Sequence, residues 1–524
     1  MGKYLNPGNE GFRTIRKSLY VDKSGMISFI NGVIGTVDKL ICVSKPRRFG
    51  KSFAVKMLCA YYDRSCDSRE LFQDLEIAKD SSFNRCLNQY YVICFDVTWF
   101  ISIVDDIKNV VNYIQKDIIS ELAQEFNFNK EEYTSLPIAL SDVSAVTGNK
   151  FIIIIDEWDA LFREAKDDSD LQKEYLQLLR GLFKSGETDK MIKAAYMTGI
   201  LPIKKYGTQS ALTDFREYSM ITPKKLAEYV GFTENEVRVL CMEYQMDFDE
   251  AKKWYDGYSF SRIKSVYSPN SVVQAIKNEE YGTYWTETET YESLKIYIDM
   301  DEDGLKEAIL QMLGGAKCVI DIGTFQNDMT NIKSKDDVLT LLIHLGYLAY
   351  DSKTKSVFIP NEEVRQEFIR AVKAGKHKES VKLILQSDRL LQDTLSMNED
   401  AVARAIENAH SAATAPSFYN NEQALRSVIR MAYIGCVDEF QEIQELPSGI
   451  GYADVVYLPK RGSVMPVMIV ALKWNKTSEG AIQQIKDRNY PQVLEGFGGK
   501  ILLVGINYDK DTKMHTCTIE EFQR

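Results

Sequence analysis

Apolar and polar positions follow two different periods along the first 200 residues of the chain. Short apolar runs have the length of buried strands, and the stretches between them have the 3.6-residue period of amphipathic helices. The predicted strands are residues 39–44, 91–97, 151–156 and 191–198, and the predicted helices are residues 52–62, 105–125 and 170–185. Strands that alternate with helices form βαβ units around a parallel sheet. The pattern therefore predicts an α/β fold here.

The pattern changes near residue 220. Residues 221–380 are mainly helical, with an aromatic turn at 254–260 that we interpret as packing and a helix followed by a hairpin at 337–360. Helices continue to residue 413, and a compact α/β unit completes the chain. Its predicted elements are a helix at 420–434, strands at 436–445, 451–458, 464–472 and 500–506, and a helix at 478–488. We therefore expect three domains, at residues 1–220, 221–380 and 381–524.

The composition indicates in which cellular compartment the protein acts. Of its 524 residues, 45% are hydrophobic and 27% are charged, and its apolar runs are too short to span a bilayer. The N-terminal segment has no secretory signal pattern. Nine cysteines are scattered without metal-ligand spacing, which argues against a zinc site or a disulfide framework. We expect a soluble cytoplasmic protein with no membrane partner.

The net charge of −11 argues against a surface coated with nucleic-acid-binding residues. It does not exclude a local basic groove, because charges act over only about 8 Å at physiological salt. Nucleic acid therefore stays open as a substrate.

Residues 45–52 (KPRRFGKS) lie between a predicted strand and a predicted helix, where a phosphate-binding loop belongs. Gly50 permits close approach of the backbone to phosphate, Lys51 supplies a positive charge, and Ser52 can ligate Mg²⁺. The first glycine of the usual motif is replaced by Lys45. An ordinary strand-to-helix turn is therefore an alternative interpretation of this segment taken alone.

A second motif supports the nucleotide interpretation. The apolar strand at 151–155 ends in Asp156 and Glu157, as expected for a strand that is buried on both faces of a parallel sheet. Asp156 would hold Mg²⁺, and Glu157 would polarise the attacking water. Ordinary surface acids at the end of a buried strand are the alternative. Thr198, at the end of the next strand, is a candidate sensor of the γ-phosphate.

Several segments together resemble the bacterial AAA-ATPase-like family. They are the loop KPRRFGKS, the strand IIIIDEWDAL, and the segments MTGILPI, WYDGYSF and VYSPNS, and the resemblance covers about residues 1–290. It implies an ASCE-type P-loop fold with a helical lid, with ATP and Mg²⁺ as cofactors. It also implies that Lys45 is a family trait. Arg47 and Arg48 have either a phosphate role or a structural one, and Phe49 and Phe53 complete the predicted nucleotide-binding set.

The C-terminal unit carries an ordered set of polar residues. They are Glu422 on a helix, Asp454 on a strand, Lys473 after an apolar strand, and Gln484 on the following helix. This order resembles the PD-(D/E)xK nuclease superfamily, which has a restriction-endonuclease-like fold. Glu422 and Asp454 would then hold Mg²⁺, which prefers oxygen ligands. Lys473 would stabilise charge that develops on the phosphate, and Gln484 matches the family's helical glutamine. An ordinary α/β module with surface Asp and Lys residues is the alternative.

Ala471 departs from this pattern. It stands two positions before Lys473, where the family has an acidic residue, and a methyl group cannot bind a cation. Either the site was inactivated by substitution or it decayed naturally. The intact neighbouring residues favour the first interpretation.

Two functions are consistent with the sequence, and a P-loop that binds nucleotide without turnover is a third possibility. In the first, a P-loop ATPase regulates a Mg²⁺-dependent nuclease, inactivated at Ala471, whose role by analogy is defence against foreign nucleic acid such as phage DNA. In the second, a nucleotide-dependent switch uses a non-cleaving C-terminal domain to bind nucleic acid or another partner. DNA is favoured over RNA, and a homo-oligomer is left open.

Overall fold

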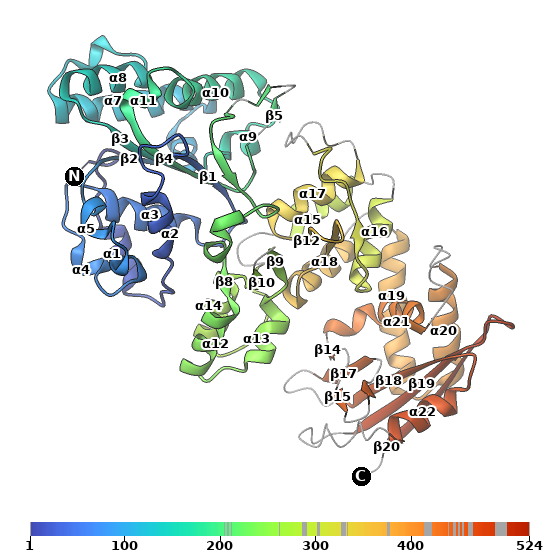
Figure 1. Cartoon of the computed structure of the whole chain (residues 1–524). Coiled ribbons are helices and arrows are strands. Elements are labelled where there is room, and N and C mark those ends of the chain that lie inside the picture. Colours follow the sequence, from blue (N-terminus) through green and yellow to red (C-terminus); the bar gives the residue numbers. More distant parts are fainter. Residues whose placement is uncertain are drawn as a thin grey trace. The chain divides into compact units, whose positions relative to one another are not determined.

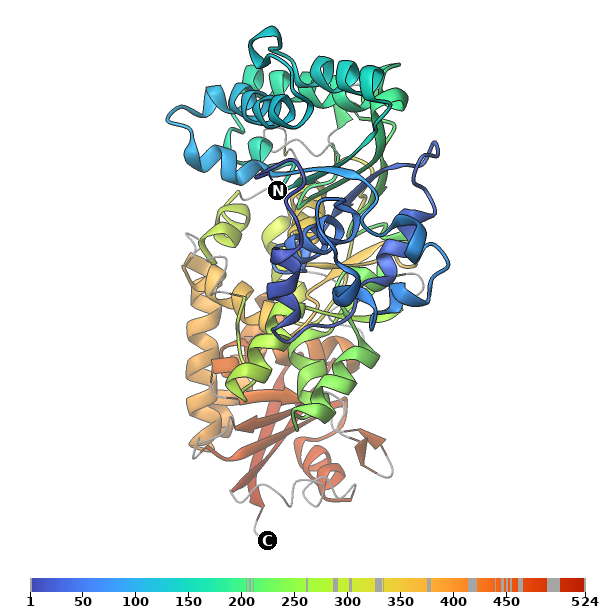
Figure 2. The same ribbon diagram turned by 90° about the vertical axis from the view of Figure 1, so that its left-hand side faces the viewer.

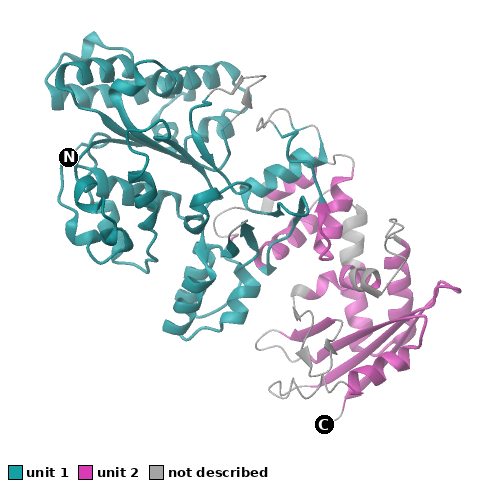
Figure 3. Ribbon diagram, in the orientation of Figure 1, with its two compact units in different colours: residues 1–284, 319–362 teal, residues 285–318, 363–524 magenta. Residues whose placement is uncertain are grey.

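The computed structural model describes residues 2–203, 205–206, 209–210, 212–260, 263–285, 291–300, 304–325, 332, 334–374, 378–412, 422–438, 440–443, 447–448, 451–452, 455–459, 465–487 and 500–522. The chain forms two compact units (Figure 3). Unit 1 comprises Met1–Tyr284 and Val319–Glu362, and unit 2 comprises Trp285–Cys318 and Glu363–Arg524. Each unit has its own sheet and its own apolar core.

A five-stranded parallel sheet forms the centre of unit 1 (Figure 1). Its order is β2-β3-β4-β1-β7, and every neighbouring pair is parallel. The strands are β1 (Leu40–Ser44), β2 (Tyr91–Asp96), β3 (Phe151–Asp156), β4 (Ile192–Gly199) and β7 (Arg216–Tyr218). The predicted α/β fold with a parallel sheet is confirmed. Strand β7 was absent from the prediction.

Helices cover both faces of this sheet, and the two layers are visible in both views (Figures 1 and 2). One layer contains α7 (Val110–Phe126), α8 (Leu136–Thr147), α9 (Ala160–Glu164) and α10 (Ser169–Phe183). The other contains α1 (Glu10–Arg16), α2 (Gly25–Asn31), α3 (Lys51–Tyr62), α4 (Arg69–Phe72) and α5 (Phe83–Cys86). Strand β3 serves both cores, because Ile153 and Ile155 face the first layer while Ile152 and Ile154 face the second. The apolar run of β3 is unbroken because both faces of the strand are buried.

Shorter elements lie between these helices and strands along the chain. They are η1 (Glu76–Lys79), α6 (Val97–Ile103), η2 (Ile107–Asn109), η3 (Lys130–Glu132), α11 (Thr188–Met191), β5 (Lys205–Tyr206), β6 (Gln209–Ser210) and η4 (Lys224–Tyr229).

The strand register brings the ends of three strands to one edge of the sheet. Ser44 of β1 lies beside Gly199 of β4, and Ile155 of β3 lies beside Met197 of β4. In a parallel sheet these are all carboxyl ends, where ligand sites commonly form. The loop after β1 and the acidic residues at the end of β3 therefore meet at this edge.

The rest of unit 1 is a mixed helical region. It contains β8 (Phe232–Thr233), α12 (Glu234–Glu243), α13 (Phe248–Tyr255), β9 (Tyr258–Phe260), β10 (Ile263–Tyr267), α14 (Pro269–Asn278), α17 (Lys335–Leu345), β12 (Ala349–Asp351) and β13 (Ser356–Phe358). The last three confirm the predicted helix and hairpin.

The aromatic turn 254–260 packs against this hairpin module. The Tyr258 hydroxyl donates to the Gly346 carbonyl at 2.5 Å, and the Asn361 amide donates to the Asp256 carbonyl at 2.8 Å. Gly257 has φ of +117°, and a Cβ there would lie 1.9 Å from the Pro360 carbonyl oxygen. Only glycine meets both demands. The turn is a packing element, as interpreted from the sequence.

Unit 2 is built on a second five-stranded sheet, of order β14-β17-β18-β19-β20. The strands are β14 (Phe440–Ile443), β17 (Val455–Pro459), β18 (Val467–Trp474), β19 (Ile501–Tyr508) and β20 (His515–Phe522). Only the pair β18 and β19 is parallel, and the other three pairs are antiparallel. The predicted strand at 436–445 starts later than expected, because Ile434–Asp438 forms the 3-10 helix η6. Strand β20 was not predicted.

Helices also cover both faces of the second sheet. The helices of unit 2 are α15 (Tyr291–Ile298), α16 (Leu305–Leu313), α18 (Glu362–Ala374), α19 (Lys378–Leu395), α20 (Glu399–Ala412), α21 (Glu422–Ala432) and α22 (Ser478–Asp487). Residues of α19, α20 and α21 pack on one face of the sheet, and α22 packs on the other. Along β18, Met468, Val470 and Leu472 face the first group, whereas Ile469 and Ala471 face α22.

Candidate functional site

The predicted phosphate loop joins β1 to the amino end of α3. Gly50 precedes the helix with φ of +79°, and nothing lies within 4 Å of where its Cβ would be. Glycine adopts this backbone conformation without strain and leaves open space beside the helix N-terminus. The first backbone N–H groups of such a helix have no partner within the helix and can bind an anion.

Lys51 is the first residue of α3, and its side chain is 4% exposed. Its ammonium donates to the carbonyl oxygens of Lys45 and Pro46 at 3.2 and 3.3 Å, so it lies within the curve of the loop. The same ammonium forms an ion pair with Glu157, at 3.1 Å from Oε1. The loop lysine and the acidic end of β3 are thus in direct contact.

Asp156 ends β3, and its carboxylate accepts a hydrogen bond from the Glu157 backbone N–H at 3.0 Å. Burial raises the pKa of the Asp156 carboxyl to about 6, and the neighbouring Glu157 and Asp96 carboxylates add to that shift. The nearby Ser52 hydroxyl and the Lys51 charge act in the opposite direction and lower this pKa. A buried carboxylate beside a hydroxyl is a donor pair suited to a divalent cation with oxygen ligands.

Glu157 follows Asp156 with φ of +48°, a conformation that non-glycine residues seldom adopt. One carboxylate oxygen contacts Lys51, and the other accepts from Arg163 Nη2 at 2.6 Å. Arg163 also contacts Asp159, at 3.1 Å between Nε and Oδ2. Burial alone would lower the pKa of the Arg163 guanidinium, but the Asp159 and Glu157 carboxylates outweigh it and raise that pKa.

Asp159 and Arg163 were not singled out from the sequence. Their spacing of four residues, just after the Asp156-Glu157 pair, was the available signal, because oppositely charged side chains four apart meet on one helix face. Asp159 is 1% exposed and accepts hydrogen bonds from the backbone N–H groups of Ile200 and Leu201. It thus links the acidic segment to the end of β4.

Lys45 is buried, and its ammonium donates to the Tyr229 carbonyl. Burial, together with the nearby charges of Lys23 and Lys51, lowers the pKa of Lys45 to about 7. Phe49 is 2% exposed, and its ring meets the Tyr258 ring edge-on at 5.5 Å. These two loop residues anchor the loop to the helical region of unit 1, a role that the sequence did not indicate. Their predicted contact with a nucleotide stays a prediction.

The remaining predicted nucleotide residues lie around this centre. Arg47 and Arg48 are exposed in the loop, and Arg48 has φ of +65°. Phe53, on the first turn of α3, is 49% exposed. Thr198 is fully buried, and its hydroxyl donates to the Val43 carbonyl of the neighbouring strand at 2.9 Å. Thr198 therefore reaches a phosphate only if that hydroxyl exchanges its partner.

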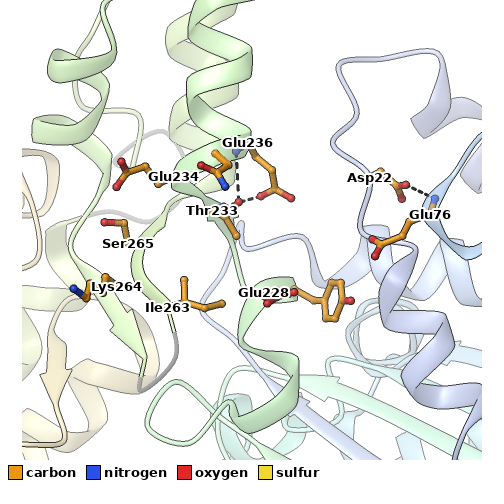
Figure 4. Close-up of a pocket in the computed structure, with 11 residues that line it drawn as sticks. Asp22, Glu76, Glu228, Thr233, Glu234, Glu236, Ile263, Lys264 and Ser265 are labelled. Carbon is orange, nitrogen blue, oxygen red and sulfur yellow. Dashed lines mark hydrogen bonds between the residues drawn. The ribbon is translucent and has the colours of Figure 1, made fainter.

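An acidic cavity of about 510 Å³ opens elsewhere in unit 1 (Figure 4). The carboxylates on its lining are Asp22, Glu76, Glu228, Glu234 and Glu236. Two of them already serve the fold: Asp22 accepts from the Glu76 backbone, and Glu236 accepts from Thr233 in the capping box of α12. Because this cavity is strongly negative, it does not suit a polyphosphate. The loop at β1 is the better candidate for nucleotide binding.

In unit 2, two of the predicted residues meet. The Lys473 ammonium, at the end of β18, donates to the Gln484 side-chain carbonyl on α22. Ala471 lies two residues earlier on the same face and is 1% exposed. Glu422 is the first residue of α21, but its side chain and all of Asp454 lie outside the described part of the chain.

Within the described residues, no three His, Cys, Asp or Glu side chains form a group able to hold a metal ion. The same residues include no helix long and apolar enough to cross a bilayer.

Residues 7–208 match one protein family, which is described as "Predicted AAA-ATPase". The matched region contains the phosphate loop, the Asp156-Glu157 segment and four of the five strands of the first sheet. This match supports a P-loop ATPase domain in this part of the chain, in agreement with the sequence interpretation.

Individual proteins that are similar to the chain share little sequence identity with it. A protein of Azotobacter chroococcum mcd 1, described as an uncharacterized protein in the vnfD 5' region, is 21% identical over 534 residues, which span 98% of this chain and 97% of that protein. Among solved structures, the Aeropyrum pernix ORC2 protein with ADPNP and ADP is 11% identical with a TM-score of 0.31, over 68% of this chain and 96% of that one. AMPPCP-bound DnaA from Aquifex aeolicus is 10% identical with a TM-score of 0.26, over 68% and 89%. These structural similarities are too weak to assign a substrate.

Proposed function

We propose that unit 1 binds ATP with Mg²⁺ at the loop of residues 45–52 and hydrolyses it. The proposal rests on one contact between distant segments, the ion pair of Lys51 in the loop with Glu157 after β3. Ser52 follows Lys51 in the chain, and Asp156 precedes Glu157. A lysine, a hydroxyl and two carboxylates at a helix N-terminus are the groups that phosphoryl transfer from a nucleotide requires. The match of residues 7–208 to the predicted AAA-ATPase family supports the same function.

The residues present fit this cofactor. The raised pKa of Asp156 reflects the cost of a buried negative charge, which a bound cation would offset. Ser52 and Asp156 would hold Mg²⁺, which would neutralise charge on the phosphate oxygens. Lys51 would exchange Glu157 for phosphate, and the freed Oε1 of Glu157 would orient the attacking water and accept its proton. Arg47, Arg48 and Phe53 lie exposed on the loop and helix, where they can contact the nucleotide.

Steady-state phosphate release tests the proposal. Glu157→Gln keeps the size of the side chain and removes the base, so hydrolysis should fall about 100-fold or more. Binding of a non-hydrolysable ATP analogue should persist. Wild-type hydrolysis in the Glu157→Gln variant would overturn the assignment of the base. Absence of ATP binding in the wild-type protein would overturn the function itself.

We further propose that the nucleotide cycle regulates unit 2 as a PD-(D/E)xK nuclease-like unit, which acts on nucleic acid, DNA rather than RNA, in defence against foreign DNA. The contact of Lys473 with Gln484 supports this, because the resemblance predicts those two residue types in one site. With alanine at position 471, the described residues do not fit a catalytic Mg²⁺. We therefore expect cleavage only when residue 471 is acidic.

One observation favours a second function, a nucleotide-dependent switch whose unit 2 binds nucleic acid or a partner without cutting it. Ala471 packs among apolar side chains beneath α22, and its neighbour on β19 is Gly505. A Cβ at Gly505 would lie 2.3 Å from the Ser478 carbonyl oxygen, so the helix approaches the sheet closely there. A carboxylate at position 471 would enter this apolar environment at a cost in free energy. The position is therefore suited to a small apolar residue.

The variant Ala471→Glu separates the two functions. Restored Mg²⁺-dependent cleavage of DNA or RNA would support the nuclease, and Ala471→Gln is the matched control because it has the same shape without a metal-binding charge. If Ala471→Glu folds and cuts neither nucleic acid, the nuclease proposal fails and the switch is favoured.

A further inference from the structure

Arg163 contacts the two carboxylates that follow β3. It lies on the short helix α9, and its guanidinium reaches Glu157 through Nη2 at 2.6 Å and Asp159 through Nε at 3.1 Å. The side chains of Arg163 and Glu157 are 11% and 18% exposed. Two nitrogens of one planar fork thus fix the relative position of two carboxylates in a largely dry environment.

Asp159 holds the Arg163 guanidinium in a fixed position. Its carboxylate accepts from the Leu201 N–H at 2.8 Å and from the Ile200 N–H at 3.2 Å, directly after β4. Gly199 provides the space, because a Cβ there would lie 2.3 Å from Asp159 Oδ1. The Arg163 guanidinium is therefore held in place from the sheet rather than by a mobile surface partner.

The two oxygens of Glu157 consequently have different surroundings. Glu157 Oε2 pairs with the Arg163 guanidinium, whereas Oε1 faces the phosphate loop and contacts the Lys51 ammonium at 3.1 Å. A phosphate that draws Lys51 away would leave Oε1 directed at the nucleotide while Oε2 stays fixed. A base held in this way loses less orientational freedom in the transition state.

We propose that Arg163 is a positioning residue that fixes Glu157 by one carboxylate oxygen and couples it, through Asp159, to the end of β4. This rests on the proposed role of Glu157 in ATP hydrolysis. Arg163 itself does not contact the reacting atoms in this scheme. Its effect is on kcat, because it orients the base and leaves the phosphate-binding groups of the loop unchanged.

The test uses the full chain with Arg163→Gln, measured for steady-state ATP hydrolysis and for binding of a methylene-bridged ATP analogue with Mg²⁺. We expect kcat to fall about 10- to 100-fold, as for a base displaced by about 1 Å. The Kd of the analogue should change less than about threefold, because the groups of the loop that bind the phosphates in the ground state are unchanged. Arg13→Gln is the matched control, since Arg13 forms an exposed pair with Glu10 at 3.6 Å, and it should hydrolyse ATP at the wild-type rate.

Two further variants separate positioning from general support of the fold. Arg163→Lys keeps the charge but cannot bridge both carboxylates, so its kcat should lie between those of wild type and Arg163→Gln; it also serves as the test if the glutamine variant does not fold. Adding Arg163→Gln to Glu157→Gln should cause no further loss, because the group to be positioned is already absent.

Three results would overturn the inference: wild-type kcat in Arg163→Gln, an additive loss in the double variant, or analogue binding that weakens as much as kcat falls. A slow Glu157→Gln variant with a normal Arg163→Gln variant would reject only this inference. A normal Glu157→Gln variant would reject the proposed base itself.

Discussion

The Lys51 ammonium lies 3.1 Å from the Glu157 carboxylate, so the residue proposed to bind phosphate is paired with the residue proposed to activate water. Both side chains are largely buried. In the proposed scheme, a nucleotide phosphate replaces Glu157 as the partner of Lys51. Binding of the nucleotide therefore also frees Glu157 to act as the base.

Removing Lys51 should weaken nucleotide binding. A hydrogen bond to a charged group contributes roughly 1.5–3 kcal/mol, so Lys51→Met should raise the Kd for ATP by about 10- to 100-fold. Glu157 stays paired with Arg163, which limits the effect on folding. Isothermal titration calorimetry measures the change. Lys56→Met, at an exposed position of the same helix, is the control and should bind ATP normally.

The buried Asp156 carboxyl should make stability depend on pH in the absence of nucleotide. Its folded pKa of about 6 lies above the ordinary value of 3.8, so the folded protein binds this proton more tightly than the unfolded chain does. The contribution of Asp156 is therefore most favourable below about pH 4 and is lost as the pH rises through about 6. Asp156→Asn should be more stable than wild type at pH 7.5, by up to about 3 kcal/mol, and should show less of this dependence.

Denaturant unfolding at pH 4.5 and 7.5 measures this effect, with Asp167→Asn as the control because Asp167 is exposed. Equal pH dependence in wild type and Asp156→Asn would contradict the burial argument. Mg²⁺ with ATP should selectively stabilise the wild-type protein, because the ligand adds binding free energy only to the folded state.

Two phenylalanines of the loop region should behave differently when truncated. Phe49 is buried against Tyr258, so Phe49→Ala should destabilise unit 1 by about 3–5 kcal/mol. Phe53 is 49% exposed, and Phe53→Ala should change stability by less than about 0.5 kcal/mol. Thermal and urea unfolding compare the two variants. If Phe53 contacts the nucleotide as proposed, its loss should weaken ATP binding while stability stays unchanged.

Lys473 should contribute to nucleic-acid binding by unit 2 whether or not the unit cuts. Lys473→Met should weaken DNA binding uniformly across sequences and reduce the slope of log K against log salt by about 1, as expected for one lost phosphate contact. Fluorescence anisotropy at several salt concentrations provides the measurement. Lys476→Met, at an exposed position three residues on, is the control. Unchanged affinity and slope in Lys473→Met would remove the basis for a nucleic-acid site at this lysine.

The parallel sheet of unit 1 could be predicted because its strands are buried on both faces. Ile152 to Ile155 alternate between two cores, which leaves an unbroken apolar run in the sequence. Strands β7 and β20 lack this signal. β7 has only three residues, and β20 (HTCTIEEF) alternates apolar positions with polar and charged ones at the edge of its sheet.

The candidate site was predictable where the chemistry lies within one motif. Lys51, Ser52, Asp156 and Glu157 followed from residue type and from their position at strand ends. The anchoring of Lys45 did not, because its partner is a backbone carbonyl 184 residues away, and no side-chain pattern encodes that contact. Arg163 was missed for a related reason: its role depends on how Asp159 is held by Ile200 and Leu201, which only the folded chain brings together.

The central claim is that unit 1 hydrolyses ATP with Glu157 as the base, and a single-turnover experiment on the full chain tests it most directly. Excess wild-type and Glu157→Gln protein are mixed with limiting γ-labelled ATP and Mg²⁺, and bound ATP and released phosphate are followed together. We expect both proteins to bind the nucleotide and phosphate release in the variant to be slower by about 100-fold or more. Equal rates of release, or no binding by either protein, would contradict it.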